Sequence, residues 1–486
     1  MNRSVMKTIR ILNPFMVPLA VYGWTILFMG GCMVGPDFSP PHPDVPSGWT
    51  GVADISASQT SIPTPDPAEL TQCWKQFNDP MLTQLVEDAL KANLDVKLAV
   101  ARLRQARAAE GIAIAALLPT LGATAEYLRE TLLPVNGREG RAQNFYQAGL
   151  DAGWEIDVFG GQRRNVESAK ANTQAAVETI SGARVSLVAE VALNYIQLRC
   201  YQQEIAVARK NLKSQQDTVL ITRRRADAGL LSQLDIANAE ANAATTEAQI
   251  PVFETSARQS IYALSVLLAR PPADLLEQLT PTGKIPDVPT QIPSGLPSDL
   301  LRRRPDIRQT EEQLHAATAQ IGVATADLFP KFALTGTLGL QSNQLSTLVS
   351  SGGRIYSGGP SATWQIFQGG AIISNIRMQE ALRDQAFITY QETVLGAFQD
   401  VENSLIAFNK EQEHYKSLRE SVEANSKAAD LSLQLYTEGL LDFLNVLVAQ
   451  RSLYTAENAL VQSSSNIVTD LVALYKALGG GWEASI

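Results

Sequence analysis

Apolar and polar residues alternate strictly in two stretches of this chain, residues 145–157 and 331–341. A period of two residues is that of a β-strand with one apolar and one polar face. Residues 121–128 and 355–367 show the same pattern more weakly, and Pro360 in the last of them indicates a bulge or bend. The alternation therefore predicts four strands, arranged as two hairpins.

The polar face of the second strand carries three acidic residues, Asp151, Glu155 and Asp157. A half-buried soluble sheet is one explanation, and paired acids also act as general acid–base partners. A membrane sheet is favoured, because strands of ~10–13 residues cross a bilayer when they are tilted. Trp154 and Trp364 also occupy equivalent strand ends, where an aromatic girdle lies. We therefore predict that the three acids face a wet lumen that favours cations.

Four strands are too few to close a barrel by themselves, since single-chain membrane barrels begin at about eight strands. Open strand edges cannot lie in lipid, where N–H and C=O groups find no water. Two chains would supply the minimal number of strands with little lumen, whereas three would leave a conducting pore. The sequence therefore predicts a trimer that shares one twelve-stranded outer-membrane β-barrel, with four strands from each chain.

A helical pattern dominates the rest of the chain, so the fold class is mainly α with a small β part. Residues 162–228 and 371–438 contain no proline and would form helices of ~100 Å each. In the first of them an apolar residue recurs every seven positions, at Val191, Leu198, Ile205, Leu212 and Val219. This heptad repeat predicts a coiled-coil barrel that continues the β-barrel into the periplasm. A fibrous stalk is the simpler alternative, but it does not explain the strands.

The two halves of the chain repeat one plan. Residues 85–124 align without a gap to residues 296–335, and Gly229-Leu230-Leu231 matches Gly439-Leu440-Leu441. Each half predicts a helix, a strand hairpin, a long helix, a tight turn at glycine and a returning helix. Such a match indicates internal duplication. Gly229 and Gly439 permit the positive φ that these turns require.

The shorter helices complete this plan. We predict first helices over residues 80–116 and 297–327, and return helices that end near Ala269 and Leu478. Pro251 is expected to kink the first return helix. The chain then divides into a signal peptide (1–31), an extended arm (32–78), a first repeat (79–280), an equatorial linker (281–295) and a second repeat with a C-terminal tail (296–486).

The N-terminus has the features of a lipoprotein export signal. Basic residues precede an apolar run that ends in Gly30-Gly31-Cys32. We predict cleavage before Cys32 and acylation of its thiol, with an ordinary signal peptide or a membrane anchor as the alternative. Met33 follows in place of the Asp that retains lipoproteins in the inner membrane, which indicates the outer membrane.

Composition excludes several other functions. The net charge is −9 without a basic block, which argues against nucleic acid as a partner. No catalytic set, cofactor motif or metal-ligand spacing appears, so we predict no enzyme activity, cofactor or metal. The histidines are scattered, and His315 and His414 are expected to be ordinary helix-surface residues. Cys73 and Cys200 either pair in the oxidising periplasm or remain free.

Two basic triplets, Arg223-Arg224-Arg225 and Arg302-Arg303-Arg304, stand near expected helix ends. Solvated helix ends are the favoured interpretation of both. For the first triplet, docking of an adaptor protein is the alternative.

Several motifs resemble the TolC-like outer-membrane factors, in particular the NodT/OprM-type lipoprotein branch that serves resistance-nodulation-division pumps. The resemblance covers nearly the whole mature chain. It is carried by Cys32 with Val34-Gly35-Pro36-Asp37-Phe38, by Trp74, Phe77 and Asp79-Pro80, by Arg303-Arg304-Pro305-Asp306, by Ile321-Gly322-Val323-Ala324, by Trp364 with Gly369-Gly370, and by Leu474-Tyr475-Lys476-Ala477-Leu478-Gly479-Gly480-Gly481-Trp482.

The resemblance implies a homotrimer with an equatorial belt, held in outer-membrane lipid and working with a periplasmic membrane-fusion adaptor and an inner-membrane pump. Its implied function is a passive exit duct for drugs or other small solutes. Type I protein secretion and a non-transport coiled-coil structural role are the alternatives. The sequence does not identify the transported solute.

The resemblance also implies a gate at the periplasmic tip, closed at rest. By position, Asp227 and Tyr436 match residues that tie neighbouring helices shut, and Leu444 matches an apolar constriction. Leu435 and Val448 depart from the family pattern, which often has Arg and Asp at these two positions. The closing network is therefore expected either to be weaker than in relatives or to be held by other residues.

Overall fold

The computed structural model describes residues 33–50, 62–64, 70–131, 142–289, 291–293 and 297–480. The predicted signal peptide and Cys32 lie outside these residues. The chain forms two compact units, each made from three segments. Unit 1 takes the residues up to Pro40, Arg104–Gln174 and Glu312–Ile388, and unit 2 takes Pro41–Leu103, Ala175–Glu311 and the residues from Thr389 onward.

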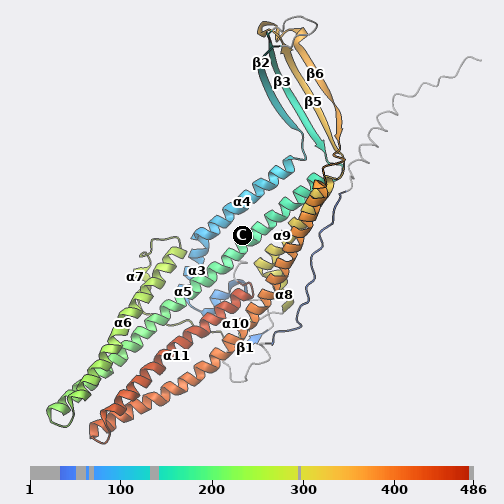
Figure 1. Cartoon of the computed structure of the whole chain (residues 1–486). Coiled ribbons are helices and arrows are strands. Elements are labelled where there is room, and N and C mark those ends of the chain that lie inside the picture. The colour runs from blue at the N-terminus through green and yellow to red at the C-terminus, as the bar shows by residue number, and fades with distance from the viewer. Residues whose placement is uncertain are drawn as a thin grey trace, which may run out of the picture. The chain divides into compact units, whose positions relative to one another are not determined.

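Unit 1 contains a four-stranded antiparallel sheet with the order β2-β3-β5-β6 (Figure 1). The four strands predicted from alternation are confirmed as β2 (Thr120–Thr131), β3 (Ala142–Ile156), β5 (Lys331–Ser342) and β6 (Arg354–Thr363). Pairing of β3 with β5 joins the hairpins of the two halves into one sheet. Strands β2 and β6 are its edges, each paired on one side only among the described residues.

The predicted bulge at Pro360 is wrong. The register between β5 and β6 continues residue by residue from Lys331 opposite Thr363 to Leu340 opposite Arg354, with Pro360 opposite Leu334. An edge strand tolerates proline because one side of its hydrogen-bonding ladder has no partner strand.

Two helical hairpins make up most of the rest of the chain. The long helices are α5 (Gly161–Asp227) and α10 (Ala371–Glu438), with 67 and 68 residues. They return through α6 (Gln233–Leu267) and α11 (Phe443–Ala477), and Figure 1 shows both pairs as hairpins. The predicted long and return helices are thereby confirmed. Pro251 lies inside α6, which continues through it.

The predicted helix over residues 80–116 is two helices, α3 (Pro80–Ala92) and α4 (Leu94–Ala115). The side-chain oxygen of Asn93 between them accepts hydrogen bonds from the N–H groups of Asp95 and Val96. Its side-chain nitrogen donates to the carbonyl of Leu267 at 2.9 Å. Asn93 therefore caps the second helix, and a distant partner holds it in place.

The helix predicted over residues 297–327 is also divided, into α8 (Pro297–Arg303) and α9 (Pro305–Ala326). Arg304 stands at the break. The residue before a proline disfavours the α conformation, which explains the interruption.

Buried side chains from both long helices and from the shorter ones form the main core. It includes Leu82 and Leu85 of α3, Tyr195 and Leu198 of α5, Leu264 of α6, Phe408 of α10 and Leu474 of α11. The smaller elements are η1 (Leu70–Phe77), α7 (Leu276–Leu279), η2 (Leu345–Thr347), η3 (Ser351–Gly353) and a parallel pair, β1 (Ile62–Thr64) with β4 (Gln291–Pro293). This pair joins the N-terminal arm to the proline-rich linker.

Within the described part of the chain, no helix has both the length and the apolar character needed to cross a membrane.

Candidate functional site

The apolar face of the sheet is open to its surroundings. Leu150 of β3 lies opposite Leu338 of β5, which in turn lies opposite Tyr356 of β6. Leu338 is 65% exposed and Tyr356 is 87% exposed. A soluble sheet covers such a face with other side chains, whereas a lipid-facing sheet leaves it bare.

The opposite face is polar, and Asp151 lies at its centre. Its carboxylate accepts hydrogen bonds from Thr124 of β2 at 2.9 Å and from Thr337 of β5 at 2.8 Å. Glu155 follows on the same face and is partly buried. Two of the three predicted strand acids therefore share one polar face of the sheet.

Asp157 differs from the other two acids, because β3 ends at Ile156. Its carboxylate accepts a hydrogen bond from the backbone N–H of Arg163 at 2.9 Å, and the Arg163 guanidinium lies 3.3 Å away. Asp157 thus caps the start of α5 beside a neutralising charge. The structure does not group it with the strand acids.

The two tryptophans mark equivalent places in the two halves. The indole nitrogen of Trp154 donates to the carbonyl of Leu117 at 2.9 Å, and that of Trp364 donates to Leu328 at 3.0 Å. Each carbonyl belongs to the turn that follows a helix. The internal repeat in the sequence is therefore accompanied by an equivalent hydrogen bond in each half of the structure.

The turns at the hairpin tips have the geometry that their glycines predict. Gly229 has φ +76° and Gly439 has φ +80°. At the first, the N–H of Leu230 donates to the Arg225 carbonyl and that of Gly229 to the Ala226 carbonyl. The second turn repeats both bonds, so both long helices end in a Schellman motif.

Tyr436 is the buried centre of the tip. Its side chain is 1% exposed and packs beside Phe443 and Val446 of the second hairpin. Its hydroxyl donates to the Thr222 hydroxyl of α5 at 3.2 Å. The Arg225 guanidinium lies over its ring, 4.6 Å from the centroid, and donates to its carbonyl.

Asp227 and Tyr436, which the resemblance implies tie neighbouring helices shut, do not bond each other within the chain. Asp227 is exposed, and its carboxylate forms no hydrogen bond or ion pair with other described residues. The link between the two hairpins is present, but Thr222 and Arg225 provide it. The sequence does not indicate this role of Arg225, because the basic triplet Arg223-Arg224-Arg225 has the pattern of a solvated helix end.

Leu444 does not join the buried cluster at the tip. It is 63% exposed, whereas its neighbour Phe443 is 3% exposed. Val448, one turn further along α11, is also exposed. Apolar side chains of this hairpin are therefore available to neighbours outside the chain.

Above the tip, polar contacts continue to join the two hairpins. One joins α6 to α11, from Arg451 to Asn242 at 3.0 Å, and the others join α5 to α11, several of them spaced by about one heptad. The contacts between α5 and α11 are Gln450 to Thr218 at 2.8 Å, Lys210 to Glu457 at 2.7 Å, Asn211 to Glu457, and Gln462 to Glu204 at 3.0 Å.

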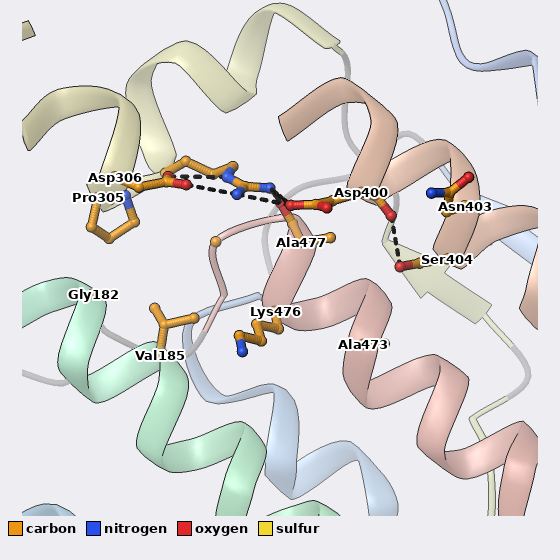
Figure 2. Close-up of a pocket in the computed structure, with 12 residues that line it drawn as sticks. Gly182, Val185, Pro305, Asp306, Asp400, Asn403, Ser404, Ala473, Lys476 and Ala477 are labelled. Atoms are coloured by element: carbon orange, nitrogen blue, oxygen red, sulfur yellow. Dashed lines mark hydrogen bonds and ion pairs between the residues drawn. The ribbon is translucent and has the colours of Figure 1, made fainter. Parts of the chain in front are cut away.

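A cavity of about 370 Å³ lies in unit 2 where α8 gives way to α9 (Figure 2). The Arg304 guanidinium there pairs with Asp306 at 2.7 Å and Asp400 at 3.0 Å, and donates to the Ala477 carbonyl at 3.1 Å. Its side chain is largely buried, so Arg304 is not the solvated helix end that the sequence indicated. It caps α11 and connects that helix to α10.

Cys73 and Cys200 are both free and buried, so the open question of a disulfide is answered. Burial raises the pKa of the Cys73 thiol to about 12 and that of Cys200 to about 11. Both thiols therefore stay protonated and unreactive at neutral pH. Among the described residues, no group of three or more His, Cys, Asp or Glu side chains is placed to hold a metal ion.

The family model of the outer membrane efflux protein matches residues 85–270 and 296–480. The chain belongs to the outer membrane efflux protein family. Nodulation protein T of Rhizobium leguminosarum bv. viciae is 34% identical over 459 residues, covering 94% of this chain and 92% of that protein. Toluene efflux pump outer membrane protein TtgF of Pseudomonas putida is 31% identical over 465 residues, covering 94% and 95%.

Solved structures of other efflux-family channels match the whole fold. The outer-membrane channel OprN aligns with a TM-score of 0.86 and 36% identity, over 93% of this chain and 100% of that one. The open state of the Neisseria gonorrhoeae MtrE outer membrane channel aligns with a TM-score of 0.77 and 30% identity, over 93% and 99%.

Family membership confirms the resemblance, the mainly helical fold class with its small sheet, and the predicted function of an outer-membrane efflux channel. The family matches twice, once in each half of the chain. The chemistry visible at the site agrees with a duct: the sheet separates a polar from an apolar face, and the tip joins two hairpins.

Proposed function

We propose that this efflux-family chain acts as a homotrimeric exit duct that conducts drugs or other small solutes passively to the cell exterior. The observation that carries the proposal is the four-stranded sheet with a bare apolar face and two open edges, β2 and β6. In lipid those edges must pair, and a neighbouring chain can supply the missing strand on each side. Three chains would close one twelve-stranded barrel.

The helical hairpins would continue this barrel into the periplasm and meet the rest of the pump. The partners are a periplasmic membrane-fusion adaptor and an inner-membrane pump of the resistance-nodulation-division class. The duct itself carries out no reaction on the solute. Names of relatives such as the toluene efflux pump outer membrane protein support a pump of small molecules over a protein secretion system.

The domain plan follows the two repeats. Residues 79–280 and 296–486 form equivalent halves, the arm (32–78) and linker (281–295) contribute to an equatorial belt, and residues 1–31 are removed. Pairing of β1 with β4 supports the belt, because it joins the arm directly to the linker.

Acylation of Cys32 would hold the chain in the outer membrane alongside the barrel. The supporting observation is the Gly30-Gly31-Cys32 junction. Mass spectrometry of the mature N-terminus is expected to find a lipid-modified cysteine. An unmodified N-terminus at another residue would contradict this part of the proposal.

The lumen acids and the tip supply selectivity and gating. Asp151 and Glu155 would form charged rings that concentrate cations. At the tip, Tyr436 and Arg225 would hold the hairpins of one chain together, while exposed Asp227 is free to bond a neighbouring chain. Three copies of Leu444 would approach the axis and block ions by dewetting.

Conductance of the purified protein in planar bilayers tests the duct. Discrete, cation-selective channels from a species that native mass spectrometry identifies as a trimer are the expected result. A structural lipoprotein would give no channels, and a dimer would contradict the shared barrel.

A further inference from the structure

Among the described residues of unit 1, Arg164 near the start of α5 is the most completely buried large side chain, with 1% of its surface exposed. Its guanidinium contacts Glu167 at 2.7 Å and Asp37 of the N-terminal arm at 2.5 Å. It also donates to the carbonyls of Val34 at 3.2 Å and Gly35 at 3.5 Å. One buried cation thus binds the arm at three residues within four positions of sequence.

The backbone of the arm lies in close contact with α9. Gly35 has φ +88°, and a Cβ added there would lie 2.4 Å from the Cα of Gly322. A Cβ added at Gly322 would lie 2.7 Å from the Arg164 side chain and 2.9 Å from the Val34 carbonyl oxygen. Only glycine fits at either position, so the arm and α9 are shaped for each other.

An aromatic contact completes the set. The Phe38 ring stacks on the His315 ring of α9 with centroids 4.3 Å apart and 12° between the planes. The same imidazole lies 3.0 Å from the Glu167 carboxylate. His315 is therefore not the ordinary surface residue that the sequence indicated, because it connects the arm to the partner of Arg164.

At its other end the arm reaches the junction of β3 and α5. The Val34 N–H donates to the Phe159 carbonyl at 3.1 Å. A Cβ added to Gly160, which has φ +81°, would lie 2.8 Å from the Met33 Cα. Cys32 is bonded to Met33, so a lipid on that cysteine is tethered next to the end of the membrane strand.

We propose that unit 1 contains a peptide-binding site, the arm clamp, made by Arg164, Glu167, His315 and Gly322, with residues 33–38 of this chain as its ligand. The ligand class is an extended peptide with a positive-φ glycine, a carboxylate two residues later and an aromatic ring next. The clamp fixes the lipid anchor at the level where β3 ends, and this consequence rests on the proposed acylation of Cys32.

Hydrogen exchange of the full-length protein in detergent tests the clamp. The variant is Gly35→Ala, which places a Cβ against α9, and the control is Gly48→Ala, whose Cβ meets nothing within 4 Å. We expect exchange over residues 34–38 to rise at least about tenfold in Gly35→Ala. Gly48→Ala should match the wild type, and peptides from β3 and α5 should keep their protection in both.

A spin label on Ser39→Cys gives a second readout, because Cys73 and Cys200 are buried and unreactive. The label should be immobilised in the parent and mobile when Gly35→Ala is added. Arg164→Gln should release the arm as well, while Arg163→Gln, whose native partner is Asp157, should not.

Unchanged protection in Gly35→Ala, or an equal loss in Gly48→Ala, would overturn the clamp. The mass of the N-terminus is measured on the same samples. A clamped arm without a lipid would contradict the proposed anchor and leave the binding site standing, so the two failures are distinguishable.

Discussion

The Arg225 guanidinium lies over the ring of Tyr436, 4.6 Å from its centroid, and donates to the carbonyl of the same residue. Arg225 lies in the last turn of α5, in the first hairpin, and Tyr436 lies in the last turn of α10, in the second. The contact therefore joins the two helical hairpins of one chain at the tip, where we propose that the gate lies.

Loss of this contact is expected to favour the open tip. A charge-assisted hydrogen bond and a cation–π contact together are worth about 1.5–3 kcal/mol, so Arg225→Ala should raise the open population roughly tenfold or more. Open probability in planar bilayers is the measurement. Arg224→Ala is the control, since Arg224 is exposed and takes no part in the contact between Arg225 and Tyr436. Equal effects of both variants would contradict the role of Arg225.

The apolar constriction is tested by Leu444→Ser. A ring of serines should stay wet where a ring of leucines excludes ions, so single-channel conductance should rise. Adding Asp227→Ala should raise it further and increase vancomycin sensitivity in cells. Leu234, the equivalent position in the first hairpin, is 68% exposed and provides the control Leu234→Ser. Unchanged conductance in a correctly assembled Leu444→Ser, Asp227→Ala channel would place the gate elsewhere.

Cation preference is expected to depend on Asp151. Replacing Asp151 by Asn removes one negative charge per chain from the polar face, and the shift in reversal potential should show a several-fold lower cation-to-anion permeability ratio. Asp157→Asn should change it little, because Arg163 already neutralises that carboxylate. An anion preference in the wild type would remove the basis of this prediction.

Asp470 on α11 makes stability depend on pH. Burial, with the neighbouring Glu411 charge as a smaller cause, raises the pKa of Asp470 from 3.8 to about 6. The folded state thus favours the protonated form. Burial of this carboxyl therefore does not lower the free energy of unfolding below pH ~4, and it lowers that free energy increasingly as the pH rises to about 6. Asp470→Asn should therefore stabilise the protein at pH 7, by up to about 3 kcal/mol, and not at pH 4.

Thermal unfolding of Asp470→Asn and the parent at both pH values measures this difference. Asp217→Asn, which removes an exposed carboxylate of α5, is the control. A gain in stability that is equal at pH 4 and pH 7 would show that burial of the Asp470 charge is not its cause.

The local sequence pattern was enough to predict the strands, the long helices and the turns at the hairpin tips. Alternation and heptad spacing depend only on neighbours in sequence, and the positive φ of Gly229 and Gly439 is a property of the turn itself. The family motifs added the function. The interpretations of Arg225, Arg304 and His315 as solvated residues failed, because a charged or polar side chain on a helix looks solvated until its distant partners are known.

Only the tertiary structure decided which residues far apart in the sequence contact each other. Tyr436 finds Thr222 across 214 positions of sequence, and the Asn93 carboxamide that divides α3 from α4 bonds Leu267 across 174. The sequence alone determined the elements, because periodicity and backbone preference act within a few residues. The partners of buried polar groups depend on packing between elements, and a buried donor or acceptor must be satisfied by whichever group the fold brings within reach.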